Sequence, residues 1–375
     1  MTEAVPVVIP VGDNSTLFWG ITTAERIRRL ARAMKLPAGQ AGDGAVPALL
    51  ASCTHAFDPA WLRHFARHPG TALTLAGVPV IAHCRNATER AAAEAAMRDG
   101  TPLSSDVTLA PMPMEGGASI LNEQLRKREQ PFAMPLTPAT LRAAERASYF
   151  GAYKGVTDIL TKYLWPEWAL VLTRIAARIG MTPNMVTAIG AILCVLATVA
   201  FWHGHFWSGM AMGLGFMVLD TVDGKLARCT VTSSKWGNVF DHGIDLVHPP
   251  FWWVAWGVGL IAYGRPLEPE VLQWTLAIIL IGYVVQRLIE GAFMRLYGMH
   301  IHVWQKVDSD FRLITARRNP NMVLLFVATL VGRPDIGLIA VAVWTALSLV
   351  FHAVRLAQAM ARVRLAPIRS WLEQA

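Results

Sequence analysis

Four aspartates within one short stretch are the residues best suited to do chemistry. The stretch DTVDGKLARCTVTSSKWGNVFDHGID runs from Asp220 to Asp245. On a helix, Asp220 and Asp223 would share one face with Gly224 and Ala227, which follow them by four residues. That face is acidic and sterically open.

A second acidic stripe follows after a short turn. Gly237, Asp241 and Asp245 repeat every four residues, so a helix would present all three on one side. The two stripes can face each other. Helix caps or loop charges at a membrane boundary are the alternative reading, and the matching helical faces argue against it.

Such a cluster requires cations. An ionised aspartate within a bilayer costs roughly 2.5 to 3.5 kcal/mol on insertion scales, and neighbouring like charges add to that cost. Ligands that are all oxygen favour Mg²⁺ or Mn²⁺, and carboxylates from two helices can bridge two ions. Two ions suit phosphoryl transfer, since they neutralise a diphosphate and the leaving phosphate together. Gly224, Ala227 and Gly237 would leave room for a nucleotide beside them.

The composition indicates a membrane protein. Of 375 residues, 54% are hydrophobic and only 16% are charged, too apolar for a soluble domain of this length. The net charge of +8 comes from Lys and Arg that flank the apolar runs, so nucleic acid is not an indicated partner. The four cysteines show no metal or disulfide spacing and are expected to be reduced.

The apolar runs predict about six transmembrane helices of about 20 residues each. Their approximate ranges are 184–203, 206–226, 237–262, 269–294, 319–332 and 335–357. Lys and Arg gather near 225–235, in 295–318 and after Arg355, so the positive-inside rule places these loops and both termini in the cytoplasm. No secretory signal opens the chain.

Just before the first span, EWALVLTRIAARIG predicts an amphipathic helix lying in the membrane interface.

Residues 1–150 mix β-prone runs with helical stretches. VPVVIPV and ALTLAGVPVIAHC favour strands, whereas TTAERIRRLARAMKL and ATERAAAEAAMRDG favour helices. This alternation predicts a cytoplasmic α/β domain with a largely parallel sheet. The stretch TLAPMPMEGGAS is the best candidate for a flexible excursion.

The aspartate stretch resembles the signature of the CDP-alcohol phosphotransferase family, D-x2-D-G-x2-A-R-x8-G-x3-D-x3-D. All of its fixed positions match, including Arg228, and the resemblance covers about residues 155–360, leaving 361–375 as a cytoplasmic tail. The resemblance implies a multi-pass enzyme of the cytoplasmic membrane that transfers a phosphoalcohol group from a CDP-alcohol to an acceptor hydroxyl and releases CMP in phospholipid biosynthesis. Mg²⁺ or Mn²⁺, as two ions, a site facing the cytoplasm and a homodimer are expected with it.

The same resemblance implies roles for single residues. Asp220, Asp223 and Asp241 would be metal ligands, and Asp245 both a ligand and the general base. The nucleotide would lie against residues of both helices and of TPNMVT, which opens the first span. These nucleotide-binding candidates are Pro183, Asn184, Thr187, Gly224, Ala227, Arg228 and Gly237.

Weaker features concern the acceptor. Arg317 and Arg318 precede the fifth span and could hold a phosphate, or simply anchor the loop. His242 beside the acidic stripe could touch the acceptor. Gln286, Arg287 and Glu290 are functional intramembrane groups, residues that pair with each other to fix helix packing, or polar residues that lie close to the membrane interface.

Residues 1–150 faintly resemble the nucleotidyltransferase domains fused to some family members. The resemblance rests on GITTAERIRRL and LRKREQPFAMPLT, but the glycine-rich phosphate loop expected after the first strand is missing. We therefore expect a degenerate domain that docks on the membrane half or supports dimerisation.

The position of the lipid and the class of protein stay open. The lipid could be on the donor, as in CDP-diacylglycerol acting on a polar alcohol, or on the acceptor of a polar donor such as CDP-inositol. A cation-conducting protein or a non-catalytic scaffold would also accommodate acidic residues in a membrane.

Overall fold

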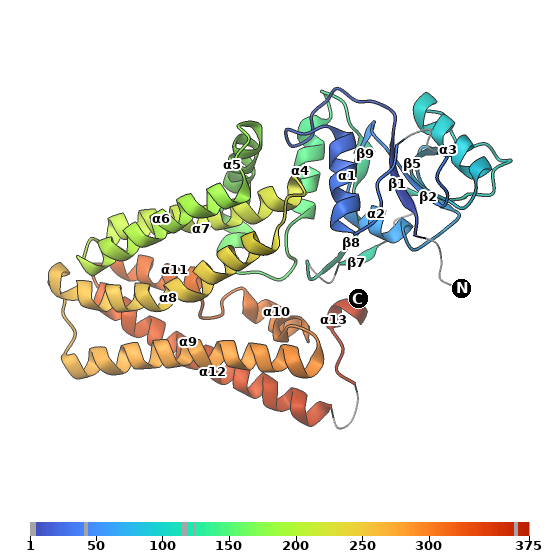
Figure 1. The fold of residues 1–375 in the computed structure, drawn as a ribbon. Helices are drawn as coiled ribbons and strands as arrows, with labels where there is room; N and C mark the ends of the chain where they lie inside the picture. The colour runs from blue at the N-terminus through green and yellow to red at the C-terminus, as the bar shows by residue number, and fades with distance from the viewer. Residues whose placement is uncertain (1–4, 41–43, 115–118, 123–124, 364–366, 375) are drawn as a thin grey trace.

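The computed structural model describes residues 5–40, 44–114, 119–122, 125–363 and 367–374. For positions 120, 121, 129, 235, 238, 241 and 374 it describes the backbone alone. The chain folds into a sheet-containing N-terminal half and a helical C-terminal half, which lie side by side (Figure 1). The last helix of the first half ends at Gly151, and the domain boundary near residue 150 stays a prediction.

A five-stranded sheet organises the N-terminal half, in the order β1-β2-β5-β4-β6. Its strands are β1 (Val7–Val11), β2 (Ala48–Ser52), β4 (Thr71–Leu75), β5 (Val78–Cys84) and β6 (Ala110–Pro113). β1 pairs with β2, and β4 with β6, in parallel, whereas β5 is antiparallel to both of its neighbours. The prediction of a largely parallel sheet was therefore wrong.

The cause of that error is the turn between β4 and β5. Ala76 and Gly77 both have positive φ angles, 49° and 82°. Two consecutive residues of this kind form a tight hairpin whose twist matches that of the strands, and a hairpin makes its strands antiparallel. ALTLAGVPVIAHC therefore forms two strands rather than part of a strand-helix-strand unit.

Helices cover both faces of the sheet. α1 (Thr23–Ala33) and α2 (Pro59–Phe65) bury Ile27, Leu30 and Phe65 on one face, and α3 (Ala87–Asp99) buries Met97 on the other. Polar side chains cap these helices: Thr22 accepts from Glu25 N, Asp58 from Ala60 N and Asn86 from Glu89 N. The stretch expected to be flexible contributes β6, and its residues 115–118 lie outside the described residues.

Shorter elements complete this half and lead toward the membrane. β3 (His55–Phe57) pairs with β9 (Ala133–Pro135), and β7 (Ile120–Asn122) pairs with β8 (Lys127–Glu129) in a small hairpin. α4 (Leu141–Gly151) follows and ends beside the helical half (Figure 1).

The C-terminal half is built from long helices at each position where the apolar runs predict one. Short elements join them: η2 (Leu160–Leu164), η3 (Ile301–Val303), α10 (Lys306–Arg312) and α13 (Trp371–Gln374). The long helices are α5 (Pro166–Arg178), α6 (Pro183–Trp202), α7 (Phe206–Cys229), α8 (Lys235–Tyr263), α9 (Pro269–Tyr297), α11 (Arg318–Leu330) and α12 (Pro334–Arg362).

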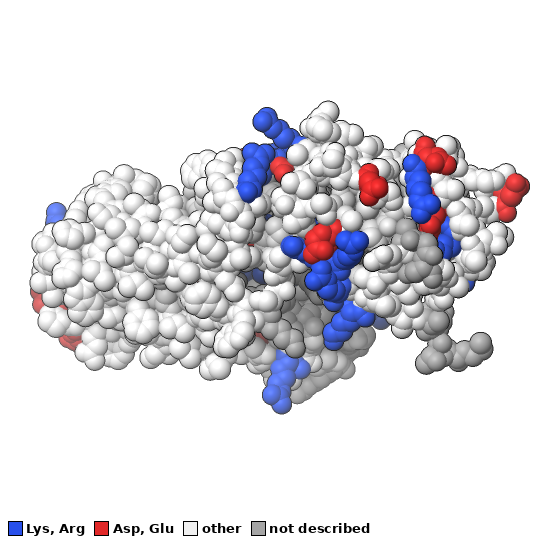
Figure 2. Space-filling view, turned by 45° about the horizontal axis from the view of Figure 1, so that its top comes forward, with Lys and Arg blue, Asp and Glu red and all other residues white. Residues whose placement is uncertain are grey.

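Three helices of the described chain are long and apolar enough to cross a membrane: α6, α9 and α12. The helical half in Figure 2 presents a broad surface almost free of charged side chains, whereas charges gather over the other half. The remaining predicted spans do not meet the same criterion. α11 has 13 residues, a rise of about 20 Å, which is short of a hydrocarbon core of about 30 Å.

α5 presents an exposed apolar face, and its predicted place in the membrane interface stays a prediction. Trp168, Ile175 and Ile179 are exposed, while Ala169 and Thr173 are buried against the protein. On the polar side, Arg174 Nε donates to Glu145 Oε2 of α4 at 2.8 Å. The apolar side chains therefore lie on the outside, where a bilayer can receive them.

The N-terminal half is attached to the end of α7, the helix that carries the first acidic stripe. Arg26 of α1 donates to the carbonyl oxygen of Cys229, and Arg29 donates to that of Thr230 at 3.0 Å. These carbonyls lie at the C-terminal end of α7. The last carbonyls of a helix have no N–H donor within the helix, and the helix dipole favours positive charge beside them. Trp19 adds a 3.2 Å hydrogen bond from Nε1 to Ser148 Oγ of α4.

We expect Arg26→Ala to lower the stability of the whole protein. Arg26 is 3% exposed, and its removal leaves a buried carbonyl at the end of α7 without a donor. Such a loss costs about 1 to 3 kcal/mol. The measurement is the thermal unfolding midpoint of the purified protein in detergent. Arg32→Ala on the same helix is the matched control, because Arg32 is exposed and pairs only with Glu25 among the described residues. Equal midpoints for the two variants would contradict the capping role.

Candidate active site where the acidic helices meet

Asp223 is the most deeply buried of the described motif carboxylates. Its side chain is 3% exposed, and Thr187 of α6 donates from Oγ1 to Asp223 Oδ2 at 2.5 Å. The backbone N–H of Gly224 donates to the other oxygen, Oδ1. Thr187 in turn lies one turn after Pro183, the first residue of α6. The start of α6 therefore fixes the orientation of this carboxylate.

Asp220 and Asp245 meet at one guanidinium. Arg318, the first residue of α11, donates from Nη2 to Asp220 Oδ2 and from Nη1 to Asp245 Oδ1, both at 2.8 Å. Its guanidinium also lies 4.7 Å from the ring centre of Phe216. A single side chain thus joins the stripes of α7 and α8, which confirms that the two acidic faces oppose each other.

The small residues of the motif lie at points of close approach, and the room they were predicted to leave for a nucleotide stays a prediction. A Cβ on Gly237 would come within 2.9 Å of Asn184 Oδ1, so the start of α8 lies directly against the start of α6. Gly224 lies next to the guanidinium of Arg228 in the same way. Asp241 stands one turn before Asp245 on α8, and its side chain lies outside the described residues.

A polar cavity of about 420 Å³ opens beside this cluster. Asp220, Asp245, Arg228 and His242 line it, together with segments far apart in the sequence. Positive groups outnumber negative ones among the described lining residues. They are Arg126, Lys154, Lys225, Arg228, Arg287, Arg312, Arg317 and Arg318, against Asp158, Asp220, Asp245 and Glu290.

Arg317 turns away from Arg318 and binds a different carboxylate. Its Nη2 lies 2.5 Å from both oxygens of Glu290, which also accepts from Arg287 Nη2 at 2.9 Å. Arg287 and Glu290 therefore pair with each other, which is one of the three alternatives predicted for them. Arg317 is engaged by the protein and still faces the cavity.

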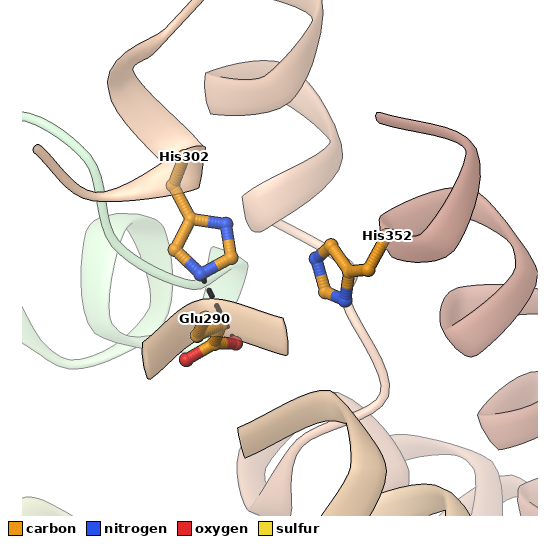
Figure 3. Close-up of side chains that lie close together, drawn as sticks. All are labelled: Glu290, His302 and His352. Atoms are coloured by element: carbon orange, nitrogen blue, oxygen red, sulfur yellow. Dashed lines mark ion pairs between the residues drawn. The ribbon is translucent and has the colours of Figure 1, made fainter. Parts of the chain in front are cut away.

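His302 and His352 approach Glu290 from two further elements (Figure 3). His302 Nε2 lies 3.3 Å from Glu290 Oε1, and burial holds the pKa of His302 well below its usual range although Glu290 opposes this. Glu290 is already neutralised by two arginines, so this cluster does not favour a cation.

An apolar groove of about 910 Å³ runs between α6 and α8. Val195, Val199, Phe240 and Val247 line its length, and Asn184 stands among the lining residues at the start of α6. The groove and the polar cavity share one stretch of α8, because His242 and Asp245 face the cavity while Gly243 and Val247 face the groove.

The described motif carboxylates fit divalent metal. Asp220, Asp223 and Asp245 offer only oxygen, come from two facing helices and converge closely enough for one guanidinium to bridge two of them. Arg318 leaves an excess of negative charge among these three carboxylates. Hard cations such as Mg²⁺ and Mn²⁺ prefer this type of ligand.

The profile of the CDP-alcohol phosphatidyltransferase family matches residues 180–315, which include both acidic stripes. Over these residues the chain is similar to this family, and residues 1–150 lie outside the match. This similarity and three helices long and apolar enough to cross a membrane indicate a multi-pass membrane protein.

Relatives of known name align with part of the chain. Cholinephosphotransferase 1 of Gallus gallus is 32% identical over 128 residues, 31% of this chain and 37% of that protein. Phosphatidylinositol phosphate synthase of Mycobacteroides abscessus is 38% identical over 112 residues, 28% of this chain and 50% of that protein. Archaetidylinositol phosphate synthase of Pyrococcus horikoshii is 25% identical over 174 residues, 44% of this chain and 79% of that protein. The chain thus spans about a third to a half of the first two relatives.

Sequence reasoning missed several residues of the cavity. Asp158 accepts from Asn319 Nδ2 at 3.0 Å and ties the segment after α4 to α11. Lys225 is 3% exposed, and its ammonium lies 2.9 Å from the ring centre of Tyr153. Arg126 comes from the β7–β8 hairpin. No local spacing marks these residues, since each meets the cavity through contacts distant in sequence.

We expect Thr187→Val to weaken divalent metal binding by roughly 10- to 100-fold, because a ligand that loses its orienting hydrogen bond holds metal less well. Mn²⁺ binding to the purified protein, measured from the electron paramagnetic resonance signal of free Mn²⁺, reports this directly. Thr198→Val on the same helix is the control, since Thr198 bonds only its own helix at Cys194 O among the described residues. Wild-type affinity in Thr187→Val would show that Asp223 is not a ligand oriented in this way.

Proposed function

We propose that this protein transfers a phosphoalcohol group from a CDP-alcohol to the hydroxyl of an acceptor and releases CMP. The observation that carries the proposal is the convergence of the α7 and α8 stripes, with Asp220 and Asp245 joined through Arg318 beside a polar cavity. The family match over residues 180–315 supports it. An ion channel or a scaffold would need no such cavity with a basic lining.

Asp245 is the proposed general base. It is the most exposed of the motif carboxylates with a described side chain, at 44%, and it faces the cavity from α8. In the proposed reaction Asp245 takes the proton of the acceptor hydroxyl, and the oxygen attacks the donor phosphorus distal to cytidine. The bond from that phosphorus to the bridging oxygen breaks, and CMP leaves with the electron pair.

Asp220, Asp223, Asp241 and Asp245 would hold Mg²⁺ or Mn²⁺, expected as two ions. When bound, such ions supply positive charge that neutralises the diphosphate and the leaving CMP. The orientation of Asp223 by Thr187 supports a ligand role for it, because metal-binding carboxylates are commonly held by a second hydrogen bond.

The nucleotide would lie between the starts of α6 and α8 and the face of α7. Glycine at 237 lets the start of α8 approach Asn184 at the start of α6, and glycine at 224 lets the Arg228 guanidinium lie against α7, which supports this placement. Ala227, one turn after Asp223, is the remaining candidate on this face. Arg228 faces the cavity and would pair with the diphosphate. Pro183 and Asn184 would contact the nucleotide from α6, while Thr187 acts through Asp223.

The apolar groove supports a lipid substrate. Because one stretch of α8 lines both the groove and the cavity, a molecule with acyl chains could lie in the first and place its polar head in the second. The lipid can be on the donor or on the acceptor, and the relatives differ in the headgroup that their names give. Arg317, Arg318 and His242 are the proposed acceptor contacts.

We also propose six spans, with both termini and the site on the cytoplasmic side of the cytoplasmic membrane. α7 and α8, of 24 and 29 residues, are long enough to cross a bilayer, and α11 would cross only part of it. The loop after β1, where a nucleotidyltransferase would bind phosphate, holds Trp19 against Ser148 instead. This contact supports a degenerate domain that docks on the membrane half. The homodimer stays a prediction.

We expect Asp245→Asn to lower CMP release by roughly 100- to 10,000-fold, since an amide cannot accept the proton. The assay uses purified protein, Mg²⁺ or Mn²⁺, and a panel of CDP-linked donors and alcohol acceptors. Asp310→Asn is the control, because Asp310 is exposed on α10 and pairs with Lys306. Full activity in Asp245→Asn would eliminate the general-base role. Absence of CMP from the wild type with every pair tested would favour a channel or scaffold.

Metal removal provides a separate test. Chelation with EDTA should abolish CMP release, and added Mg²⁺ or Mn²⁺ should restore it, since the carboxylates alone repel a diphosphate. Ca²⁺ serves as a comparison, because its larger radius and higher coordination number suit this reaction poorly. CMP release that continues after exhaustive chelation would overturn the metal assignment.

A further inference from the structure

The turn of the β7–β8 hairpin reaches the polar cavity from the N-terminal half. Arg126, between β7 and β8, lines the cavity together with Arg317 and Arg318, although it lies outside the residues that match the family. Its φ angle is +52°, a left-handed conformation that non-glycine residues adopt at a cost. Among the described residues its guanidinium makes no hydrogen bond.

The hairpin is held in place from both sides. Lys127 Nζ donates to Gly151 O at 2.7 Å, at the end of α4. Gly155 N donates to Leu125 O at 2.7 Å, and a Cβ on Gly155 would collide with the carbonyl oxygen of Arg126. The close approach requires glycine at 155. Arg126 is therefore presented to the cavity by an anchored turn.

The arginines that Arg126 joins have N–H groups without partners. Nε and Nη1 of Arg312, Nε of Arg317 and Nε of Arg287 are buried and find no acceptor within the described part of the chain. Burial lowers the pKa of both Arg126 and Arg312, and the positive charge of Arg317 lowers both further. Buried donors without acceptors and crowded cations are unfavourable, and an anion would relieve both.

This end of the cavity differs chemically from the end that holds the motif. Arg318 turns to Asp220 and Asp245, whereas its neighbour Arg317 turns to Glu290 on α9. The first end presents carboxylates suited to cations. The second presents guanidinium groups, whose planar N–H donors match phosphate oxygens.

We infer that Arg126, with Arg312 and Arg317, binds a phosphate group that is not transferred, so that the N-terminal half determines specificity for a phosphorylated alcohol as acceptor. The assignment of this phosphate to the acceptor rests on the proposed transfer reaction. The phosphate site itself rests on the arginines alone.

The test measures binding of radiolabelled inorganic phosphate to the purified full-length protein by equilibrium dialysis. We expect Arg126→Gln to weaken phosphate binding by roughly tenfold or more, as loss of a charged hydrogen bond does, and Arg126→Lys to retain part of the affinity. Arg128→Gln is the matched control. Arg128 lies on the same hairpin and donates to Leu372 O at 3.3 Å, outside the cavity lining.

Three results of the phosphate-binding measurement would overturn the inference. These are unchanged phosphate binding in Arg126→Gln, an equal loss of binding in Arg128→Gln, and no binding by the wild type at millimolar phosphate. CDP binding is measured in parallel and should be the same in Arg126→Gln as in the wild type. If Arg126→Gln loses CDP binding and keeps phosphate binding, Arg126 contacts the donor and the inference is overturned.

Failure of the phosphate site can be distinguished from failure of the proposed transfer reaction. If the wild type binds phosphate through Arg126 but forms no CMP with any donor and acceptor, the transfer reaction fails and the phosphate site stands. If CMP forms, Arg126→Gln should raise KM for glycerol 3-phosphate as a trial acceptor more than KM for glycerol. Equal changes in the two KM values would reject the specificity role.

Discussion

The bidentate contact of Arg318 with Asp220 and Asp245 is the interaction on which the helical half depends. Two like charges held a few ångströms apart repel each other by a few kcal/mol near a protein surface. The guanidinium replaces that repulsion with two charge-assisted hydrogen bonds and thereby links α7, α8 and α11. The preceding residue, Arg317, extends the link to Glu290 on α9. Two consecutive side chains therefore connect four helices around one cavity.

In this arrangement a polar cavity and an apolar groove lie on two sides of α8. The cavity is polar and charged, whereas the groove between α6 and α8 is almost entirely apolar. α8 separates them, since Asp245 and Gly243, two residues apart, face opposite sides. A lipid substrate requires this combination: its acyl chains lower the free energy by leaving water, and its phosphate requires donors and cations. On the face shown in Figure 2, the helical half presents a broad surface nearly free of charged side chains, which the acyl chains of a bilayer can contact.

The N-terminal half is part of the same structure rather than a domain on a flexible tether. Arg26 and Arg29 cap the helix that carries Asp220 and Asp223, so the end of α7 is closed by donors from α1. The β7–β8 hairpin adds Arg126 to the cavity wall. Loss of these contacts would leave the α7 carbonyls without their donors from α1, and that cost gives a physical reason for the attachment of the two halves.

The sequence by itself determined the features that depend on local periodicity. The four-residue spacing of the motif predicts the two acidic stripes, and apolar runs of bilayer length predict the long helices. It was wrong about the sheet, because the two-residue turn at Ala76 and Gly77 reverses the chain where a parallel connection was expected. Only the tertiary structure decided which charges meet. Arg126, Glu290 and Arg317 come from three separate segments, and no periodicity in the chain relates them. Their convergence follows from how the helices and the hairpin pack, which is a property of contacts between residues distant in sequence.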